Sequence, residues 1–181
     1  MMAMSSTTDN QPALFWIDLE MTGLDAAVDR ILECAVIVTD HDFNELEHWD
    51  SAVYQSAAVL EGMNEWCQTH HRDSGLLDRV PEGIEEAELD RLLSAKVDVR
   101  WGHTPVILCG NSIHQDRKFI DRYLPSFARR LHYRMLDVSA WKVAFIELYG
   151  LRFDKHNTHR ALDDIRESIA EFRYYLGHVK V

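Results

Sequence analysis

The chain has 181 residues, of which 46% are hydrophobic and 27% are charged, and this length suits one ordinary domain. The composition excludes the disordered and fibrous classes of protein and predicts a fold with one hydrophobic core. Acidic side chains outnumber basic ones by 30 to 19, which gives a formal net charge of −11. Such a charge disfavours a long basic groove for nucleic acid, because a polyanion is repelled by a surface of its own sign.

The start of the chain does not resemble a targeting segment. Residues 1–11 lack the basic start and the apolar run of a secretory signal, and we expect them to form a loose tail before a single domain of residues 12–181. The longest apolar stretches, such as Val106–Cys109, are too short to cross a bilayer. Three cysteines stand far apart without a CxxC pair, which favours reduced thiols over a disulfide framework or a zinc site: Cys34, Cys67 and Cys109. We therefore expect a cytoplasmic protein with no membrane partner.

The first half of the chain predicts strands followed by helices. Apolar patterning indicates three strands: Ala13–Glu20, Ile31–Asp40 and Glu45–Gln55. The turn-rich segment Thr22–Asp29 joins the first two strands. Helical spacing then indicates two helices: Asn64–His71 and Glu85–Val97.

In the second half, strands and helices alternate. The apolar run Val106–Gly110 suits a buried strand, His114–Tyr123 a helix, and Met135–Val138 a short strand. Ser139 can start the helix that follows, and Gly150 can end it. The last helix stops at Gly177 and carries one apolar stripe: Leu162, Ile165, Ile169, Phe172 and Leu176.

This order of elements predicts an α/β protein. Three consecutive strands suit an antiparallel meander, and the alternation after them suits right-handed βαβ crossovers. We therefore expect a five-stranded mixed sheet, a three-stranded antiparallel meander extended by parallel strands, with helices on both sides.

Two carboxylates lie two residues apart in the first predicted strand. Strand periodicity puts Asp18 and Glu20 on one face and the apolar residues between them on the other. On a central strand such a pair repels and loses hydration unless a cation lies between the two groups. Metal binding and an edge strand with a solvated face are both open on this pair alone.

Further acidic residues stand at the starts of two predicted helices. Asp116 follows the buried strand, and an acid in a helix's first turn also has a purely stabilising role at the helix dipole. In the last helix Asp164 borders the apolar stripe, whereas Asp163 is turned further from it, so we favour Asp164 as a ligand. At about 100° per residue, His159 and Asp164 share a site only if His159 lies in the entering loop, which Asn157 and Thr158 permit as N-cap types.

Three separated motifs together resemble the oligoribonuclease family of DEDD exonucleases, in its histidine-containing subclass. They are Trp16–Leu24 (WIDLEMTGL), Gly110–Arg117 (GNSIHQDR) and Ala161–Ser168 (ALDDIRES), with a histidine five positions before the last aspartate of the pair. The resemblance covers nearly the whole chain after the tail. It implies a ribonuclease H-like exonuclease fold, a homodimer, and two divalent cations, Mg²⁺ or Mn²⁺, held by Asp18, Glu20, Asp116 and Asp164.

The resemblance implies a mechanism of two-metal-ion hydrolysis. Two ions about 4 Å apart hold the attacking water and the leaving 3′ oxygen in line across the phosphorus. In our hypothesis Asp18 bridges both ions, Glu20 and Asp164 complete the spheres, and Asp116 reaches its ion directly or through water. His159 takes the proton of the water, because an imidazole titrates near neutrality.

The resemblance also suggests contacts with the substrate. Leu24 is expected to insert between the last two bases with help from Met21, and Trp66 and His71 to stack on a base. Tyr133 and Arg134, predicted to stand just before a strand, are expected to reach the neighbouring subunit's site and help bind substrate there, Arg134 together with Ser112 at its 5′ phosphate. Taken singly, such residues are more often core or solvated surface.

These expectations describe a 3′-to-5′ exoribonuclease that degrades short single-stranded RNA, especially dinucleotides, to 5′-mononucleotides. An enclosed short substrate bound by metals reconciles RNA with a charge of −11. Two alternatives remain: an exonuclease of the same superfamily that acts on longer RNA or DNA ends, and an inactive nucleic-acid-binding module on the same fold.

Overall fold

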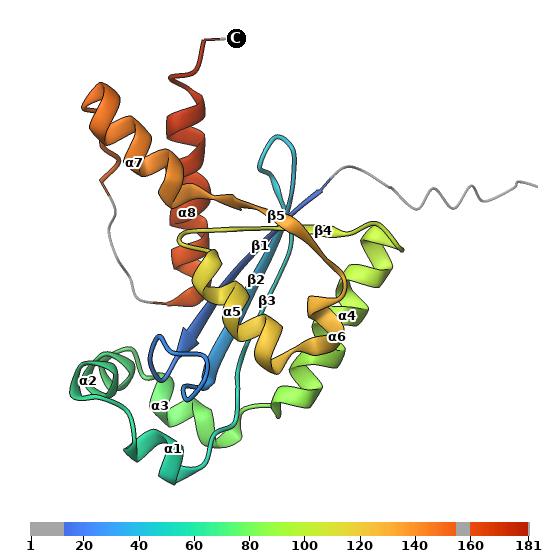
Figure 1. Cartoon of the computed structure of the whole chain (residues 1–181), viewed down its shortest axis with the longest axis vertical. Helices are drawn as coiled ribbons and strands as arrows, with labels where there is room; N and C mark the ends of the chain where they lie inside the picture. The colour runs from blue at the N-terminus through green and yellow to red at the C-terminus, as the bar shows by residue number, and fades with distance from the viewer. Residues whose placement is uncertain (1–12, 155–159, 181) are drawn as a thin grey trace, which may run out of the picture.

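A computed structural model describes residues 13–154 and 160–180. Its centre is a five-stranded mixed sheet in the order β3-β2-β1-β4-β5 (Figure 1). The strands are β1 (Ala13–Met21), β2 (Ile31–Asp40), β3 (Glu45–Ala52), β4 (Val106–Gly110) and β5 (Leu131–Asp137). Strands β1, β2 and β3 pair antiparallel, β4 runs parallel to β1, and β5 runs parallel to β4. The predicted meander with parallel strands is confirmed.

The described helices alternate with the later strands as predicted. They are α1 (Ala57–Glu61), α2 (Glu65–Asp73), α3 (Leu76–Arg79), the 3-10 turn η1 (Val80–Glu82), α4 (Glu86–Trp101), α5 (His114–Tyr123), α6 (Pro125–Ala128), α7 (Val138–Tyr149) and α8 (Ala161–Leu176). The three shortest α-helices, α1, α3 and α6, were not predicted, because four or five residues are too few to display a helical period.

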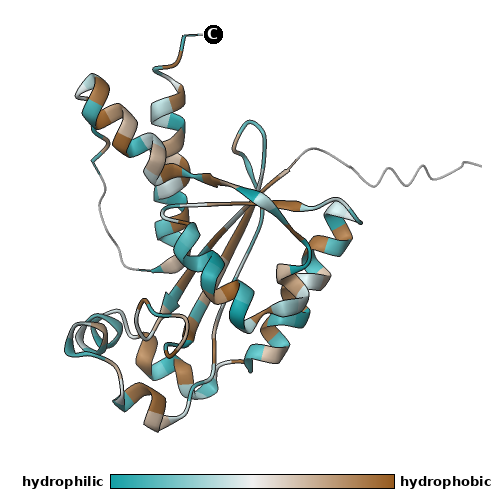
Figure 2. Ribbon diagram, in the orientation of Figure 1, coloured by the Kyte–Doolittle hydropathy of each residue, from teal (hydrophilic) through white to brown (hydrophobic). Residues whose placement is uncertain are grey.

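Two apolar layers enclose the sheet. On one face Ile17 and Leu19 of β1 pack with buried residues of α4, α5 and α6, and on the other Trp16 packs with α8. The central strands β1 and β2 are coloured mainly brown for hydrophobic residues, whereas teal dominates α2 and α5 (Figure 2). Because successive strand residues alternate between faces, Asp18 and Glu20 lie on the α8 side with Trp16.

A smaller core lies under α1, α2 and α3. Leu32 of β2 and Ala52 of β3 pack there with Cys67 of α2 and Leu76 of α3, so these short helices are fixed beside β2 and the edge strand β3. Asn64 caps α2 by accepting a hydrogen bond from the backbone N–H of Cys67. This small lobe positions Trp66 and His71.

Some predicted boundaries were wrong. Strand β5 begins at Leu131, four residues before the predicted start, so Tyr133 and Arg134 lie inside the strand. As an edge strand it carries polar side chains that hide its pattern. Helix α7 begins one residue before Ser139, because Asp137 caps it by accepting from the Ser139 N–H. The strand β3 ends at Ala52, three residues short of the predicted Gln55, whose amide instead donates to the Ile31 carbonyl.

Other expectations lie partly outside the described residues. The predicted tail and the predicted cap residues Asn157 and Thr158 fall there, whereas the described cap of α8 is Arg160, which makes no side-chain capping bond. All three cysteines are free and buried. Across residues 13–154 and 160–180, no helix has both the length and the apolar character that a membrane span requires.

Candidate active site

Three carboxylates converge on the α8 side of the sheet. Carboxylate oxygens of Asp18, Glu20 and Asp164 lie within 4.8 Å of one another, and all three residues are half-buried. The strand contributes its pair because alternate residues share a face. Helix α8 contributes Asp164 from its first turn, one position before Ile165, which packs against Trp16 in the core. The neighbouring Asp163 instead forms an ion pair with Arg166 at 3.3 Å, which fits the predicted surface position.

A fourth carboxylate, Asp116, is held against the same strand. Its Oδ1 accepts the backbone N–H of Leu19 at 2.9 Å, and Asp116 itself is buried. The two parallel strands pair only at Phe15–Leu108 and Trp16–Cys109. Beyond these pairs Gly110 passes so close to β1 that a Cβ on it would lie 2.9 Å from the Ile17 carbonyl oxygen. The chain then turns away into α5, whose first turn supplies the missing partner for Leu19.

Burial first, and repulsion between carboxylates second, oppose ionisation of Asp18 and Glu20. Burial, followed by the charges of Asp116, Glu20 and Asp164, raises the pKa of Asp18 well above its ordinary value. Burial and the charges of Glu33, Asp164 and Asp116 raise the pKa of Glu20 to about 8. Burial also raises the pKa of Asp116 to about 7, against the hydrogen bond from Leu19. Such a cluster becomes favourable in its charged form only when cations offset the repulsion.

Sequence reasoning missed a fifth carboxylate, Glu33. It is directly opposite Glu20 in the β1–β2 register and is buried. Arg79 at the end of α3 binds its Oε1 at 2.5 Å and also pairs with Asp50 of β3 at 3.1 Å. A charged residue within the apolar run of the second predicted strand was the available signal. Arg79 therefore compensates the charge of Glu33 next to the cluster, and its two ion pairs connect α3 to strands β2 and β3.

His71 joins the small lobe to the end of β1. Its Nε2 lies 2.8 Å from the Met21 carbonyl oxygen, and its Nδ1 lies 3.9 Å from Oε2 of Glu20. The carbonyl is an acceptor only, so Nε2 carries the proton that it receives. Burial lowers the pKa of His71. Because the residue is only 2% exposed, its ring supports the site, and its predicted stacking on a base stays a prediction.

An open cavity of about 540 Å³ adjoins the carboxylates. Its walls come from β1, the loop after it and helix α2: Leu19, Glu20, Met21, Gly23, Leu24, Asn64, Trp66, Cys67 and His71. Leu24 is 74% exposed and Trp66 is 70% exposed, although both are large and apolar. The Trp66 ring stacks on His70 with centroids 4.7 Å apart, and most of the Trp66 surface is still exposed. Two exposed apolar side chains beside an anionic cluster suit the faces of bases.

The loop that carries Leu24 is well anchored. Asp29 accepts hydrogen bonds from the Thr22 hydroxyl at 3.0 Å and the Asp25 N–H at 2.9 Å. Gly23 lies so close to Asp29 that a Cβ would be 2.4 Å from its carboxylate. From α5, Gln115 donates to the Leu24 carbonyl. The exposed position of Leu24 is therefore built into the loop.

The remaining predicted residues lie around the cluster or outside the described chain. Ser112 has a positive φ of 48°, and its N–H donates to Asp137 Oδ1 and Ser139 Oγ, both at 2.9 Å. Tyr133 is 73% exposed on β5, and the guanidinium of Arg134 lies 5.0 Å from the centre of its ring. His159 lies outside the described residues.

Comparisons with known proteins agree with this geometry. The Exonuclease family model, named for RNase T, matches residues 15–172. An oligoribonuclease of Francisella tularensis is 47% identical over 169 residues, which cover 90% of this chain and 93% of the relative. An oligoribonuclease of Haemophilus influenzae is 47% identical over 176 residues, which cover 91% and 93% of the two chains.

Solved structures support the fold. Escherichia coli exonuclease I in complex with a dT13 oligonucleotide has a TM-score of 0.66 at 16% identity, over 92% of this chain and 41% of that one. Exonuclease I from Methylocaldum szegediense has a TM-score of 0.69 at 19% identity, over 89% and 40% of the chains. This chain thus spans about two fifths of these larger enzymes and shares the ribonuclease H-like exonuclease fold with them. On the family match and the identity to full-length relatives, the chain belongs to the oligoribonuclease family of exonucleases.

Proposed function

We propose that the protein is a 3′-to-5′ exoribonuclease that hydrolyses short single-stranded RNA, dinucleotides above all, to 5′-mononucleotides. The observation that carries the proposal is the convergence of Asp18, Glu20 and Asp164 beside a cavity lined by exposed Leu24 and Trp66. Kinship with oligoribonucleases supports the substrate class.

The donor set fits hard divalent cations. Asp18, Glu20 and Asp164 offer only carboxylate oxygens, which suit Mg²⁺ or Mn²⁺ better than softer metals. Asp116 is outside this group of three and binds the Leu19 N–H through one oxygen, and in our proposal it reaches its ion directly or through a bound water. Two such ions, when bound, supply Lewis-acid activation of water and stabilise charge on the leaving oxygen. Calorimetric titration with each metal distinguishes Mg²⁺ from Mn²⁺.

The residues of the chain have separate roles in this proposal. His159, five positions before Asp164, accepts the proton of the attacking water, a role for which imidazole side chains in general are suited. Leu24 separates the two bases, Met21 supports it, and Trp66 stacks on one base from the other wall of the cavity. His71 holds Met21 in place through the hydrogen bond of its Nε2, and its Nδ1 lies 3.9 Å from Oε2 of Glu20.

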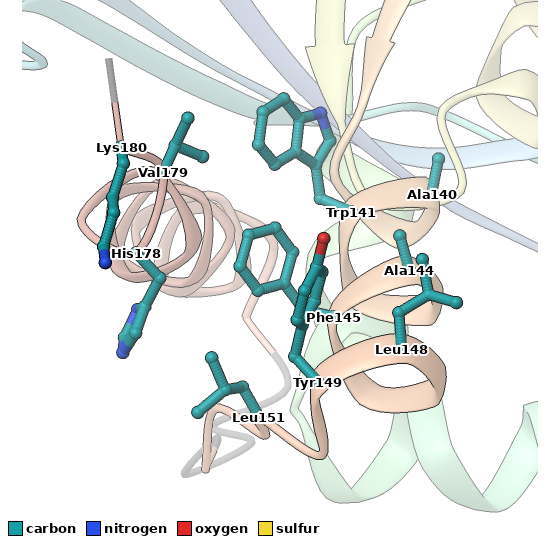
Figure 3. Close-up of a pocket in the computed structure, with 10 residues that line it drawn as sticks. All are labelled: Ala140, Trp141, Ala144, Phe145, Leu148, Tyr149, Leu151, His178, Val179 and Lys180. Atoms are coloured by element: carbon teal, nitrogen blue, oxygen red, sulfur yellow. The ribbon is translucent and has the colours of Figure 1, made fainter.

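We propose that two copies of the chain form the working enzyme. Helix α7 exposes Val143, Leu148 and Tyr149, each more than 60% accessible. An apolar cavity of about 700 Å³ runs along it, and Figure 3 shows Trp141, Phe145 and Tyr149 of α7 opposite His178 and Val179 at the chain end. Exposed apolar surface of this kind is typical of protein interfaces.

The position of this surface supports a role for β5 across subunits. Edge strand β5 leads directly into α7, and in our proposal a second copy that packs on α7 also reaches Tyr133 and Arg134. In our proposal Tyr133 helps to enclose the substrate of the partner subunit, and Arg134 covers the 5′ phosphate of that substrate. Ser112 of the subunit that holds the metals donates a hydrogen bond to the same phosphate. Sedimentation at micromolar concentration tests the dimer, and a fully active monomer would contradict it.

A length series tests the substrate class. Cleavage rates are measured for RNA of two, five and twenty nucleotides and for DNA of the same lengths. The proposal expects the RNA dinucleotide to have the highest kcat/KM, because the cavity is small and the net charge of −11 gives a long chain no basic path. Faster cleavage of the twenty-nucleotide DNA would favour the alternative of an exonuclease on longer ends.

A second experiment separates an enzyme from an inactive binding module. Asp18→Ala is expected to abolish turnover while circular dichroism and the melting curve show a folded protein. Chelation of the wild type is expected to abolish turnover as well, and added Mn²⁺ to restore it. Turnover that survives both treatments would refute metal-dependent hydrolysis by this cluster.

The fold and the cysteines support a proposal for the domain and compartment of this activity. We propose that residues 12–181 form one exonuclease domain, since the described site residues lie on one sheet, on the helices beside it and in the loops between them. Three free, buried cysteines favour a reducing compartment, and we propose the cytoplasm. Fractionation of cells that express the tagged chain tests the compartment.

A further inference from the structure

A hydrogen-bonded bridge crosses from the metal-binding helix to the serine proposed to contact the 5′ phosphate. Its centre is the amide of Asn111, in the turn between β4 and α5. The amide nitrogen donates to Ser168 Oγ on α8 at 2.8 Å, and the amide oxygen accepts from Ser139 Oγ on α7 at 3.3 Å. One side chain therefore joins three elements that are distant in sequence.

On the α8 side the bridge ends at a metal-site residue. The Ser168 hydroxyl donates to the backbone carbonyl of Asp164 at 2.8 Å, so its oxygen is free to accept from Asn111. Ser168 is only 5% exposed. The position of Asn111 is thus fixed relative to the turn of helix that presents the Asp164 carboxylate.

On the α7 side the bridge ends at Ser112. Ser139 Oγ accepts the Ser112 N–H at 2.9 Å and, because its own proton goes to Asn111, also accepts from the Ser112 hydroxyl at 3.0 Å. In the proposal the Ser112 hydroxyl turns from Ser139 to the phosphate when substrate binds. Asp137 accepts the N–H groups of both serines at 2.9 Å. These bonds hold Ser112 at its positive φ of 48°, a conformation that a serine seldom adopts unaided.

The chemistry of the neighbours fixes the orientation of the Asn111 amide. Its nitrogen also lies 3.4 Å from Oε2 of Glu171, a fully buried residue whose Oε1 accepts the Tyr175 hydroxyl at 3.1 Å. A carboxylate only accepts, so the NH₂ group faces α8 and the oxygen faces α7. A residue that bridges in this direction must be an amide, because an aspartate would place a second carboxylate against Glu171.

From these contacts we infer that Asn111 is a positioning residue that sets the distance between the metal-binding carboxylates and the Ser112 contact with the substrate's 5′ phosphate. That distance determines how many nucleotides fit between the two, and so favours a 5′-phosphorylated dinucleotide over longer or unphosphorylated RNA. The inference rests on the proposed function, in which Ser112 meets that phosphate.

The experiment compares kcat/KM for 5′-phosphorylated and unphosphorylated RNA dinucleotides in the full-length protein. In Asn111→Ala the preference for the phosphorylated substrate is expected to fall about tenfold, the effect of one hydrogen bond to a charged group. Ser168→Ala breaks only the α8 half of the bridge, and a smaller fall is expected. Mn²⁺ affinity, measured by calorimetry, is expected to stay within about twofold of wild type, because no carboxylate is removed.

A matched control removes the same type of bond elsewhere. Ser94 donates to the Asp90 carbonyl at 2.7 Å within α4, as Ser168 does to Asp164 within α8. Ser94→Ala is expected to leave the preference unchanged.

The outcomes separate the inference from the proposed function. An Asn111→Ala enzyme that loses rate equally on both substrates overturns the inference, since a merely structural role has that effect. If Asn111→Ala does not fold, the preference of Ser168→Ala decides in the same way. A preference unchanged in Ser112→Ala instead overturns the proposed phosphate contact, and with it the inference.

Discussion

The side chain of Asp116 occupies the place of a missing strand partner for Leu19. Its Oδ1 accepts the Leu19 N–H at 2.9 Å at the point where β4 has already turned away from β1. The same carboxylate is also the largest charged contributor to the raised pKa of Asp18. Asp116 therefore has a structural role through one oxygen and an electrostatic role through its charge.

Two substitutions at Asp116 separate these roles. Asp116→Asn can keep an oxygen for the Leu19 N–H but removes the charge, so we expect a metal-free protein at least as stable as wild type with activity lost. Asp116→Ala also removes the charge but leaves the buried Leu19 N–H without a partner. We expect its unfolding free energy to be about 1–3 kcal/mol below that of Asp116→Asn. Urea denaturation in chelator measures both, and equal stability of the two variants would contradict the structural role.

The pH dependence of stability tests the repulsion within the cluster. The folded-state pKa of Glu20 is raised from 4.5 to about 8, so the folded protein binds this proton more tightly than the unfolded chain does. The stability that this tighter proton binding gives to the folded protein is fully present below pH 4.5 and is lost as the pH rises through about 8. We therefore expect metal-free Glu20→Gln to match wild type near pH 5 and to exceed it above pH 8, by on the order of 2 kcal/mol after solvent screening.

The difference between variant and wild type is the useful quantity here. The lowered pKa of His71 has the opposite sign, since a histidine kept neutral in the fold gains stability as pH rises through its unfolded value. It is present in both proteins and cancels in the comparison. Melting curves in chelator from pH 5 to 9 give the difference. A gap that closes with rising pH would refute the repulsion.

The sequence alone predicted that the carboxylates of Asp18, Glu20 and Asp164 lie close together on one side of the sheet. Two of them follow from the two-residue period of a strand, and the third from the phase of a helix whose apolar stripe must face the sheet. The sequence identified Asp116 as a candidate ligand but did not predict its hydrogen bond to Leu19. That bond depends on where β4 separates from β1, which is decided by tertiary packing. The Asn111 bridge was missed for the same reason: no local pattern reveals a side chain whose partners lie on α7 and α8.

Exposed apolar side chains at the cavity are expected to act in substrate binding. Trp66→Ala and Leu24→Ala are predicted to raise KM on an RNA dinucleotide by about 5- to 160-fold, the effect of losing base stacking worth about 1–3 kcal/mol, with a smaller effect on kcat. Leu24 is 74% exposed and Trp66 is 70% exposed, so truncating either side chain is expected to change the stability of the protein little. Val99→Ala, at a residue 91% exposed on α4, is the matched control. Unchanged KM in both variants would remove the base-binding role of this cavity.

The proposed exchange of side chains between subunits predicts complementation. Arg134→Ala is expected to slow cleavage of a 5′-phosphorylated dinucleotide about tenfold or more, because a charge-assisted contact is lost. Asp18→Asn is expected to be inactive through loss of a metal ligand. A heterodimer of the two variants, co-expressed with different tags and purified on both, combines an intact metal site on one subunit with an intact Arg134 on the other.

Such a heterodimer is expected to have about half of the wild-type activity, because one of its two sites has a full set of side chains. If Arg134 instead acted within its own subunit, the subunit with intact Asp18 would still lack the arginine, and the heterodimer would be no more active than the Arg134→Ala parent. Replacing Arg134→Ala by Arg122→Ala, at an exposed arginine on α5, gives a heterodimer with half activity under either arrangement. The rate difference between these two heterodimers therefore measures how much of the Arg134 contribution comes from the partner.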